Sequence, residues 1–214
     1  MIVDRLVFLP FRRDQATDFI DEAERAEQLG WSGGAHHGRV FVVVCYDDPG
    51  KPLANMGFAS TTRILIAGHG HSGRPYISNS SGIGQKEYLP YNTVVDRLIE
   101  KGLPKRYIGA ISCDACYTSI KSDTNPAFAD LVACYLHKMG YRLSHTIGYM
   151  GPLGAVPEKI IFNHKFFRRF VDLTKDGVKA TVKSPDAKQR FNGVWSIPKH
   201  LVGFSSSLNA RPAF

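Results

Sequence analysis

Short apolar runs alternate with amphipathic segments through most of this 214-residue chain, and this alternation limits the fold more than any other feature. Runs rich in β-branched and aliphatic residues, such as VFVVVC, are typical of strands that are buried on both faces of a parallel sheet. Four such runs predict strands, over residues 39–45, 62–69, 107–112 and 144–151.

The segments between these runs show helical spacing of apolar residues. This spacing predicts helices over residues 14–29, 91–99 and 125–139, the last beginning at an Asn-Pro pair. Strands that alternate with helices imply parallel βαβ units. We therefore expect an α/β fold of three layers, with a mostly parallel central sheet flanked by helices on both faces.

The chain lacks a linker, repeat or low-complexity segment, which predicts a single domain over residues 1–214. Its core is expected at about 39–154, and a C-terminal helix and tail over 155–214 would complete the domain. Within that tail, an aromatic-rich segment predicts a helix over about 157–173. Weaker strand signals follow in VKATVKS at 178–184 and GVWSI at 193–197.

Charge and hydropathy exclude several classes of protein. The net charge is +8, from 27 basic and 19 acidic residues, but the basic residues are dispersed and no nucleic-acid-binding motif appears. No stretch is long enough to span a membrane, and the N-terminus, with Asp4 and Pro10, does not resemble a signal peptide. We expect a cytoplasmic protein without a nucleic-acid partner or membrane span.

Residues able to do chemistry follow three of the predicted strands. Ligands of parallel sheets bind beyond the carboxyl ends of the strands, so these residues are expected to gather at one edge. They are Asp47 and Asp48 after the first strand, His69 and His71 in GHGHSG after the second, and Cys113, Asp114 and Cys116 in SCDACYTS after the third.

A cysteine and a histidine at one site are suited to acyl transfer. A free thiol is only slightly ionised at neutral pH, so a cysteine nucleophile needs a base, and His69 can serve Cys116 in this way. The tetrahedral intermediate also needs hydrogen-bond donors for its oxyanion. The backbone N–H groups of Gly70 and Cys116 are candidates for that oxyanion hole.

The blocks ILIAGHGHSG and YIGAISCDACYTS resemble the His-Gly and Asp-Ala-Cys blocks of the caspase-like cysteine peptidases, clan CD. The closest resemblance is to clostripain-like and legumain-like members, and it covers roughly residues 39–154. The resemblance implies a caspase-like fold, His69 and Cys116 as a catalytic dyad, an oxyanion hole from Gly70 and Cys116, and no cofactor. It also implies that Asp114 lines the S1 pocket, so that the substrate is a protein or peptide cleaved after Arg or Lys.

Other assignments stay open at this point. Asp47 could join Asp114 in the S1 pocket, or Asp47 or Asp48 could orient His69. Cys113 and Cys116 form a C-x-x-C that could bind zinc with His69 and His71, or carry out thiol redox chemistry.

A papain-like site would instead pair Cys116 with a later histidine, His145 or His164. The chain could also be an inactive caspase-like binding module. A compact peptidase domain without a signal peptide is also compatible with a bacterial effector or toxin delivered into another cell by a dedicated secretion system. The sequence predicts neither the oligomeric state nor the activation mechanism.

Overall fold

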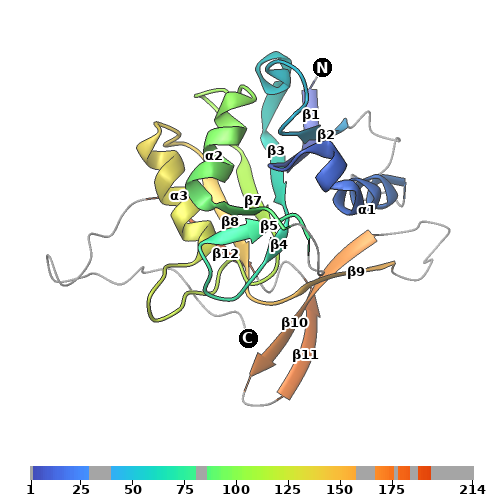
Figure 1. Cartoon of the computed structure of the whole chain (residues 1–214), viewed down its shortest axis with the longest axis vertical. Helices are drawn as coiled ribbons and strands as arrows, with labels where there is room; N and C mark the ends of the chain where they lie inside the picture. Colours follow the sequence, from blue (N-terminus) through green and yellow to red (C-terminus); the bar gives the residue numbers. More distant parts are fainter. Residues whose placement is uncertain are drawn as a thin grey trace, which may run out of the picture.

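A mixed α/β body is built on a six-stranded sheet (Figure 1). The computed structural model describes residues 2–28, 40–80, 86–157, 167–175, 178–183 and 188–193. The strand order in the sheet is β12-β8-β7-β3-β1-β2. Its strands are β1 (Ile2–Leu9), β2 (Phe41–Cys45), β3 (Gly57–Ala67), β7 (Ala110–Asp114), β8 (His145–Tyr149) and β12 (Lys188–Phe191).

Every pairing in this sheet is parallel except that of β12 with β8. The predicted α/β class with a mostly parallel sheet is therefore confirmed. The inner strands are apolar on both faces, as expected for such a sheet, since Leu6, Phe8 and Ile64 are buried on one face and Val7, Leu9 and Leu65 on the other.

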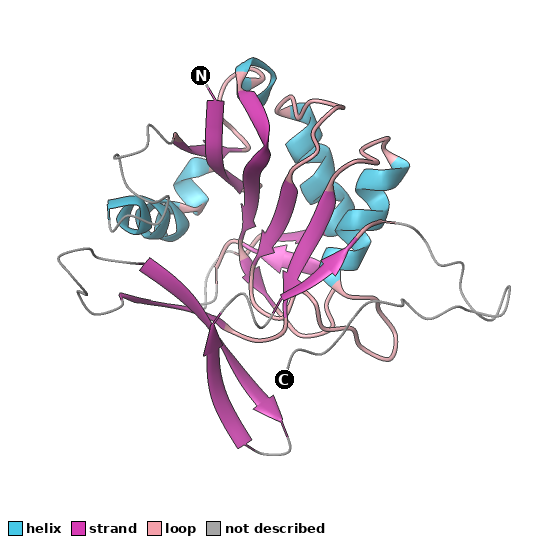
Figure 2. Ribbon diagram, turned by 180° about the vertical axis from the view of Figure 1, so that it is seen from behind, coloured by secondary structure: helices cyan, strands magenta, loops and turns pink. Residues whose placement is uncertain are grey.

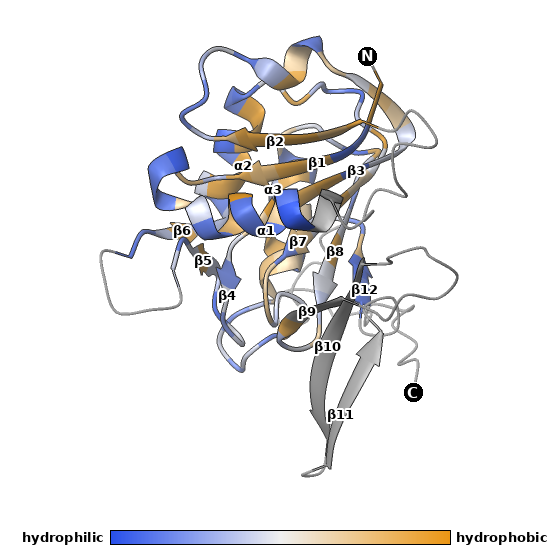
Figure 3. Cartoon of the chain, turned by 90° about the vertical axis from the view of Figure 1, so that its right-hand side faces the viewer, coloured by the Kyte–Doolittle hydropathy of each residue, from blue (hydrophilic) through white to orange (hydrophobic). Residues whose placement is uncertain are grey.

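In the described part of the chain, three α-helices lie between successive strands of the six-stranded sheet: α1 (Thr17–Gln28) between β1 and β2, α2 (Tyr91–Glu100) between β3 and β7, and α3 (Phe128–Lys138) between β7 and β8. Helices α2 and α3 contact each other, whereas α1 lies in front of the sheet in Figure 3, away from them. This division follows from topology, because the chain moves from β1 to β2 in one direction across the sheet and from β3 to β7 and β8 in the other. Right-handed crossovers in opposite directions place their helices on opposite faces.

Two predictions of secondary structure are wrong. Strand β1 has no counterpart in the sequence prediction, although it lies between β2 and β3 in the sheet. The helix predicted over 157–173 is instead strand from residue 167, where β10 (Phe167–Lys175) pairs with β9 (Leu153–Pro157) and β11 (Val178–Lys183). Residues 158–166, and residues 194–197 of the predicted GVWSI strand, lie outside the described residues.

Two smaller sheets border the body. Strands β4 (His69–Gly70), β5 (Tyr76–Ser78) and β6 (Tyr88–Pro90) form an antiparallel sheet immediately after β3. Strands β9, β10 and β11 form a second, and the β10–β11 hairpin projects from the body (Figure 2). Both sheets begin near the carboxyl edge of the main sheet, because β4 follows β3 directly and β9 follows β8.

Candidate active site

The pairing of β3 with β7 brings the histidine and cysteine blocks to the same place. The two strands are adjacent and parallel, and Ala67 at the end of β3 is the register partner of Asp114 at the end of β7. The two strands therefore end at the same level of the sheet. His69 follows the end of β3 by two residues, and Cys116 follows the end of β7 by two residues. This arrangement was expected from the sequence, and it depends on main-chain hydrogen bonding between the strands.

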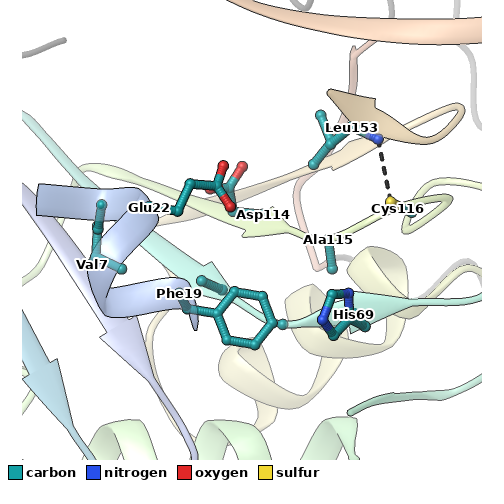
Figure 4. A pocket seen from close by; sticks show the side chains of 11 residues that line it. Val7, Phe19, Glu22, His69, Asp114, Ala115, Cys116 and Leu153 are labelled. Carbon is teal, nitrogen blue, oxygen red and sulfur yellow. Dashed lines mark hydrogen bonds between the residues drawn. The ribbon is translucent and has the colours of Figure 1, made fainter. Parts of the chain in front are cut away.

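A pocket of about 90 Å³ lies at this edge (Figure 4). His69 and Cys116 lie toward one end of it, and the carboxylates of Glu22 and Asp114 lie toward the other. The lining comes from β1, α1, the ends of β3 and β7, and β9. The lining residues are Val7, Phe19, Glu22, Ala23, Ala67, Gly68, His69, Asp114, Ala115, Cys116 and Leu153.

Cys116 is half-buried, and its sulfur has a backbone donor. The N–H of Leu153, the first residue of β9, donates a hydrogen bond of 3.2 Å to Cys116 Sγ. A donor of this kind favours the thiolate over the thiol. The sulfur thus lies in a pocket beside a histidine and accepts a hydrogen bond that suits a negative charge.

His69 is also half-buried. Burial lowers its pKa below the ordinary value of 6.5, and the positive charges of His71 and Lys86 act in the same direction, whereas Asp18 opposes them. The ring of Phe19 on α1 packs against the imidazole, with ring centroids 4.8 Å apart. Because its pKa is lowered, His69 is mainly neutral at pH 7 and can accept a proton.

Gly70 lies directly against the backbone of Cys116. A Cβ atom at position 70 would lie 2.0 Å from the carbonyl oxygen of Cys116 and 3.0 Å from its nitrogen. Only glycine allows this approach. The two residues predicted to supply the oxyanion hole are therefore in backbone contact.

The loop that carries Cys116 is held by Thr118, which is 2% exposed. The Thr118 hydroxyl lies 3.0 Å from the carbonyl oxygen of Cys113 and 3.1 Å from that of Ala115, and it accepts a hydrogen bond of 3.0 Å from the N–H of Tyr149. Between Cys116 and Thr118, Tyr117 adopts a left-handed conformation with φ of 58°. Such a conformation is uncommon for a bulky residue and requires support from its surroundings.

We expect Thr118→Val to destabilise the protein by about 1–3 kcal/mol, because it leaves a buried N–H and buried carbonyl groups without their hydroxyl partner. Urea unfolding at equilibrium measures this change. Thr118→Ser keeps the hydroxyl and should retain most of the stability. Full stability in Thr118→Val together with a loss in Thr118→Ser would show that the methyl group, rather than the hydroxyl, supports the loop.

Asp47 and Asp48 do not join the pocket. The described residues that line it include neither of them. Asp47 accepts a hydrogen bond of 2.9 Å from the N–H of Arg13, and Asp48 forms an ion pair of 2.9 Å with the Arg13 side chain. Strand β1 separates β2 from β3, so these carboxylates follow a strand about 10 Å from β3, at 4.8 Å per strand.

The geometry does not support the alternative of a zinc site. Cys113 is fully buried on β7, and burial raises its pKa far above the ordinary value. Within the described part of the chain, the only cluster with ligand atoms at metal-binding separation is Cys45, Asp47 and Asp48. The guanidinium of Arg13 pairs with Asp48 there, which supplies the positive charge that such a cluster needs.

The papain-like pairing with His145 is also unsupported. His145 begins β8 and is the register partner of Ala110 at the start of β7, whereas Cys116 follows the other end of β7. At about 3.3 Å per residue, the length of β7 separates the two. His164 lies outside the described residues.

His71, the second histidine of GHGHSG, is exposed, and the centroid of its ring lies 6.1 Å from that of Tyr76.

Several pocket residues were not identified from the sequence, among them Phe19, Glu22 and Leu153. Phe19 belongs to the apolar spacing that predicts the helix over residues 14–29, and no motif marks the other two. The spacing of Phe19 and Glu22 could have indicated that they lie together, since residues three apart share one face of a helix. That face would have been assigned to the site only once β1 was known to lie beside β3.

Comparisons with family models, with curated proteins and with solved structures found no match for this chain. Among the helices that the structure describes, none has the length and apolar character needed to cross a bilayer.

Proposed function

We propose that this chain is a cysteine peptidase in which Cys116 is the nucleophile and His69 is the general base and acid. The observation that carries the proposal is the register of β3 and β7, which brings both residues into one pocket. The proposal includes the caspase-like arrangement of the domain and a protein or peptide substrate. It rests on geometry and on the resemblance of the two sequence blocks.

The reaction begins when the Cys116 thiol transfers its proton to His69. The thiolate attacks the carbonyl carbon of the peptide, a C–S bond forms, and the carbonyl oxygen takes the negative charge. The backbone at Gly70 and Cys116 is where donors to this oxyanion are expected. The imidazolium of His69 then gives its proton to the amide nitrogen as the C–N bond breaks, and water hydrolyses the thioester.

Asp114 is proposed to select the residue before the cleaved bond. It is 5% exposed and lines the pocket two residues from the nucleophile. A buried carboxylate that lines a pocket attracts a cationic side chain and discriminates against a neutral one. Cleavage after Arg or Lys is therefore proposed.

We expect iodoacetamide to alkylate Cys116 faster than any other cysteine, and His69→Ala to slow that reaction by at least about 10-fold at pH 7. Because burial lowers the pKa of His69, its basic form is present at lower pH than usual. The rate that depends on His69 should therefore rise with pH and reach half its maximum below pH 6.5. Mass spectrometry of each cysteine over time measures these rates.

Cys134 provides an internal comparison in the same sample. It is also half-buried, but burial and the neighbouring Asp130 raise its pKa to about 12. It should react slowly at every pH between 5 and 8 and should not respond to His69→Ala. If Cys116 reacts no faster than Cys134, it is not an activated nucleophile and the proposed function is wrong.

A further inference from the structure

The small sheet that begins at His69 carries two tyrosines on its outer face. Ile77 on β5 and Leu89 on β6 are register partners, and both are buried in the core. Side chains alternate between the two faces of a sheet, so Tyr76 and Tyr88, each next to one of these residues, lie on the opposite face. Their rings pack edge to face, with centroids 5.1 Å apart and an angle of 79° between the ring planes. We call these two side chains the tyrosine face.

His69 lies on the same face of the small sheet. It is the register partner of Ser78, which is in turn the register partner of Tyr88. Register partners on neighbouring strands point to one face, so a row of side chains runs from His69 across Ser78 to Tyr88. His71, two residues after His69, should lie on this face as well, and the centroid of its ring is 6.1 Å from that of Tyr76. The proposed base and the tyrosine face therefore belong to one continuous surface.

The tyrosine face is open to solvent. Tyr88 is 50% exposed, and Tyr76 is partly exposed. A third aromatic ring can pack against such a pair with its centroid about 4.5–7 Å from theirs. This contact would remove apolar surface of all three rings from water, which favours binding. The tyrosine face can thus bind one further ring.

The proposed reaction brings one residue of the substrate to this surface. His69 gives its proton to the amide nitrogen that leaves, so this nitrogen must come within about 3 Å of the imidazole. The nitrogen belongs to the residue directly after the cleaved bond, and the side chain of that residue therefore begins beside His69. Tyr88 lies two strands from His69, about 10 Å away at 4.8 Å per strand. The side chain of the substrate residue and the Tyr88 ring can span this distance together.

The charges around the tyrosine face favour a neutral side chain over a cationic one. The positive charges of His71 and Lys86 both act to lower the pKa of His69, which places them near the proposed base. Arg74 is exposed, and its N–H donates a hydrogen bond of 3.2 Å to the carbonyl oxygen of His71. A cation can bind the face of a tyrosine ring, but here these like charges would repel a substrate lysine or arginine. An aromatic ring without charge avoids that repulsion.

We propose that Tyr76 and Tyr88 are specificity-determining residues that form a subsite for an aromatic side chain at the substrate residue directly after the cleaved bond. This inference rests on the proposed peptidase function, because it places that residue by the proton transfer from His69. It assigns selectivity to a sheet that supplies the base but not the nucleophile.

The test uses fluorogenic peptides with Arg before the cleaved bond and Phe, Ala or Lys directly after it. In the parent protein, kcat/KM should be highest for the Phe peptide and lowest for the Lys peptide. Tyr88→Ala should lower the Phe-to-Ala ratio of kcat/KM by about 3- to 10-fold, and a 10-fold change corresponds to about 1.4 kcal/mol. Tyr76→Ala should act in the same direction. Tyr88→Phe keeps the ring and should retain most of the ratio.

Leu143→Ala is the matched control for these changes. Leu143 is 66% exposed and precedes β8, whose first residue pairs with the start of β7, so it lies at the opposite edge of the main sheet from His69. Its replacement should leave the Phe-to-Ala ratio unchanged. A ratio that is the same in Tyr76→Ala, Tyr88→Ala and the parent protein would overturn the proposal.

A second measurement does not depend on peptide cleavage. Phenylalaninamide resembles the amine that leaves, and it should slow iodoacetamide alkylation of Cys116 in the parent protein and in Leu143→Ala, but much less in Tyr88→Ala. Alaninamide lacks the ring and should protect Cys116 less at the same concentration. If phenylalaninamide protects the parent protein and Tyr88→Ala equally, or protects neither, the aromatic subsite is wrong.

The two proposals fail in different ways. Rapid alkylation of Cys116 that depends on His69, with an unchanged Phe-to-Ala ratio in both alanine variants of the tyrosine face, would remove the subsite and leave the peptidase. Alkylation of Cys116 no faster than that of Cys134 would remove the nucleophile, and the subsite with it. Circular dichroism of each variant establishes that it is folded before either result is interpreted.

Discussion

Replacement of His69 by alanine is expected to lower kcat/KM for a peptide with Arg before the cleaved bond by about 10²- to 10⁴-fold. This is the usual range for loss of a general acid and base, and here the same imidazole would serve both the thiol and the leaving amine. The burial that lowers its pKa keeps it in the proton-accepting form at pH 7. Initial rates with a fluorogenic peptide measure the loss.

His71→Ala is the matched control for this change. The two histidines are separated only by Gly70, but His71 is exposed, and among the described residues it is not one of those lining the pocket. The positive charge of His71 helps to lower the pKa of His69. His71→Ala should therefore change kcat/KM by less than about threefold and shift the acid limb of the pH profile to higher pH. A large loss in His71→Ala with an active His69→Ala protein would reverse the two assignments.

Gly70→Ala is expected to lower kcat/KM about as much as His69→Ala does, but by changing the backbone geometry of the site. The new Cβ atom would lie 2.0 Å from the Cys116 carbonyl oxygen, far inside van der Waals contact, so one of the two backbones must move. A shift of about 1 Å at a catalytic group can cost about 100-fold in rate. Overpacking of this kind also costs about 1–3 kcal/mol of stability, which thermal unfolding would reveal.

Gly68→Ala offers a graded comparison two residues earlier. Its Cβ atom would approach Ile77 Cδ1 at 3.0 Å, which is a longer distance and a contact with a side chain rather than with backbone. Its effect on activity should therefore be clearly smaller than that of Gly70→Ala. Equal activity in Gly70→Ala and the parent protein would contradict the backbone contact described here.

The sequence predicted that His69 and Cys116 would lie close together, but it did not predict the order of the strands around them. The blocks ending at His69 and Cys116 each follow an apolar run, and the parallel-sheet rule places such ends at one edge. The structure brings the two residues into one pocket. What the sequence could not provide was the neighbour order of the strands, which depends on pairings between distant segments.

Strand β1 shows why Asp47 was misplaced. Its apolar run is interrupted by Asp4 and Arg5, so the pattern does not mark it as a buried strand. In the sheet it inserts between β2 and β3, which moves the end of β2 one strand further from His69. A single missing strand therefore changes which carboxylates can reach the site.

Strand β10 shows a different limit. Phe166, Phe167 and Phe170 are spaced as on one face of a helix, but the segment from residue 167 pairs on both sides with other strands. Aromatic and β-branched residues are enriched in strands, so a short run of them does not by itself indicate a helix. Pairing with β9 and β11, which no local pattern encodes, decides the outcome.

The donor to the Cys116 sulfur is a main-chain N–H, that of Leu153. Every residue except proline carries this group, so position 153 can change over evolution without removing the hydrogen bond. The contact of Gly70 with the Cys116 backbone is likewise encoded by the path of the chain, and it constrains only the glycine. A site built in this way leaves few marks in the sequence: related chains could share its geometry while keeping little more than a histidine, a glycine and a cysteine in common.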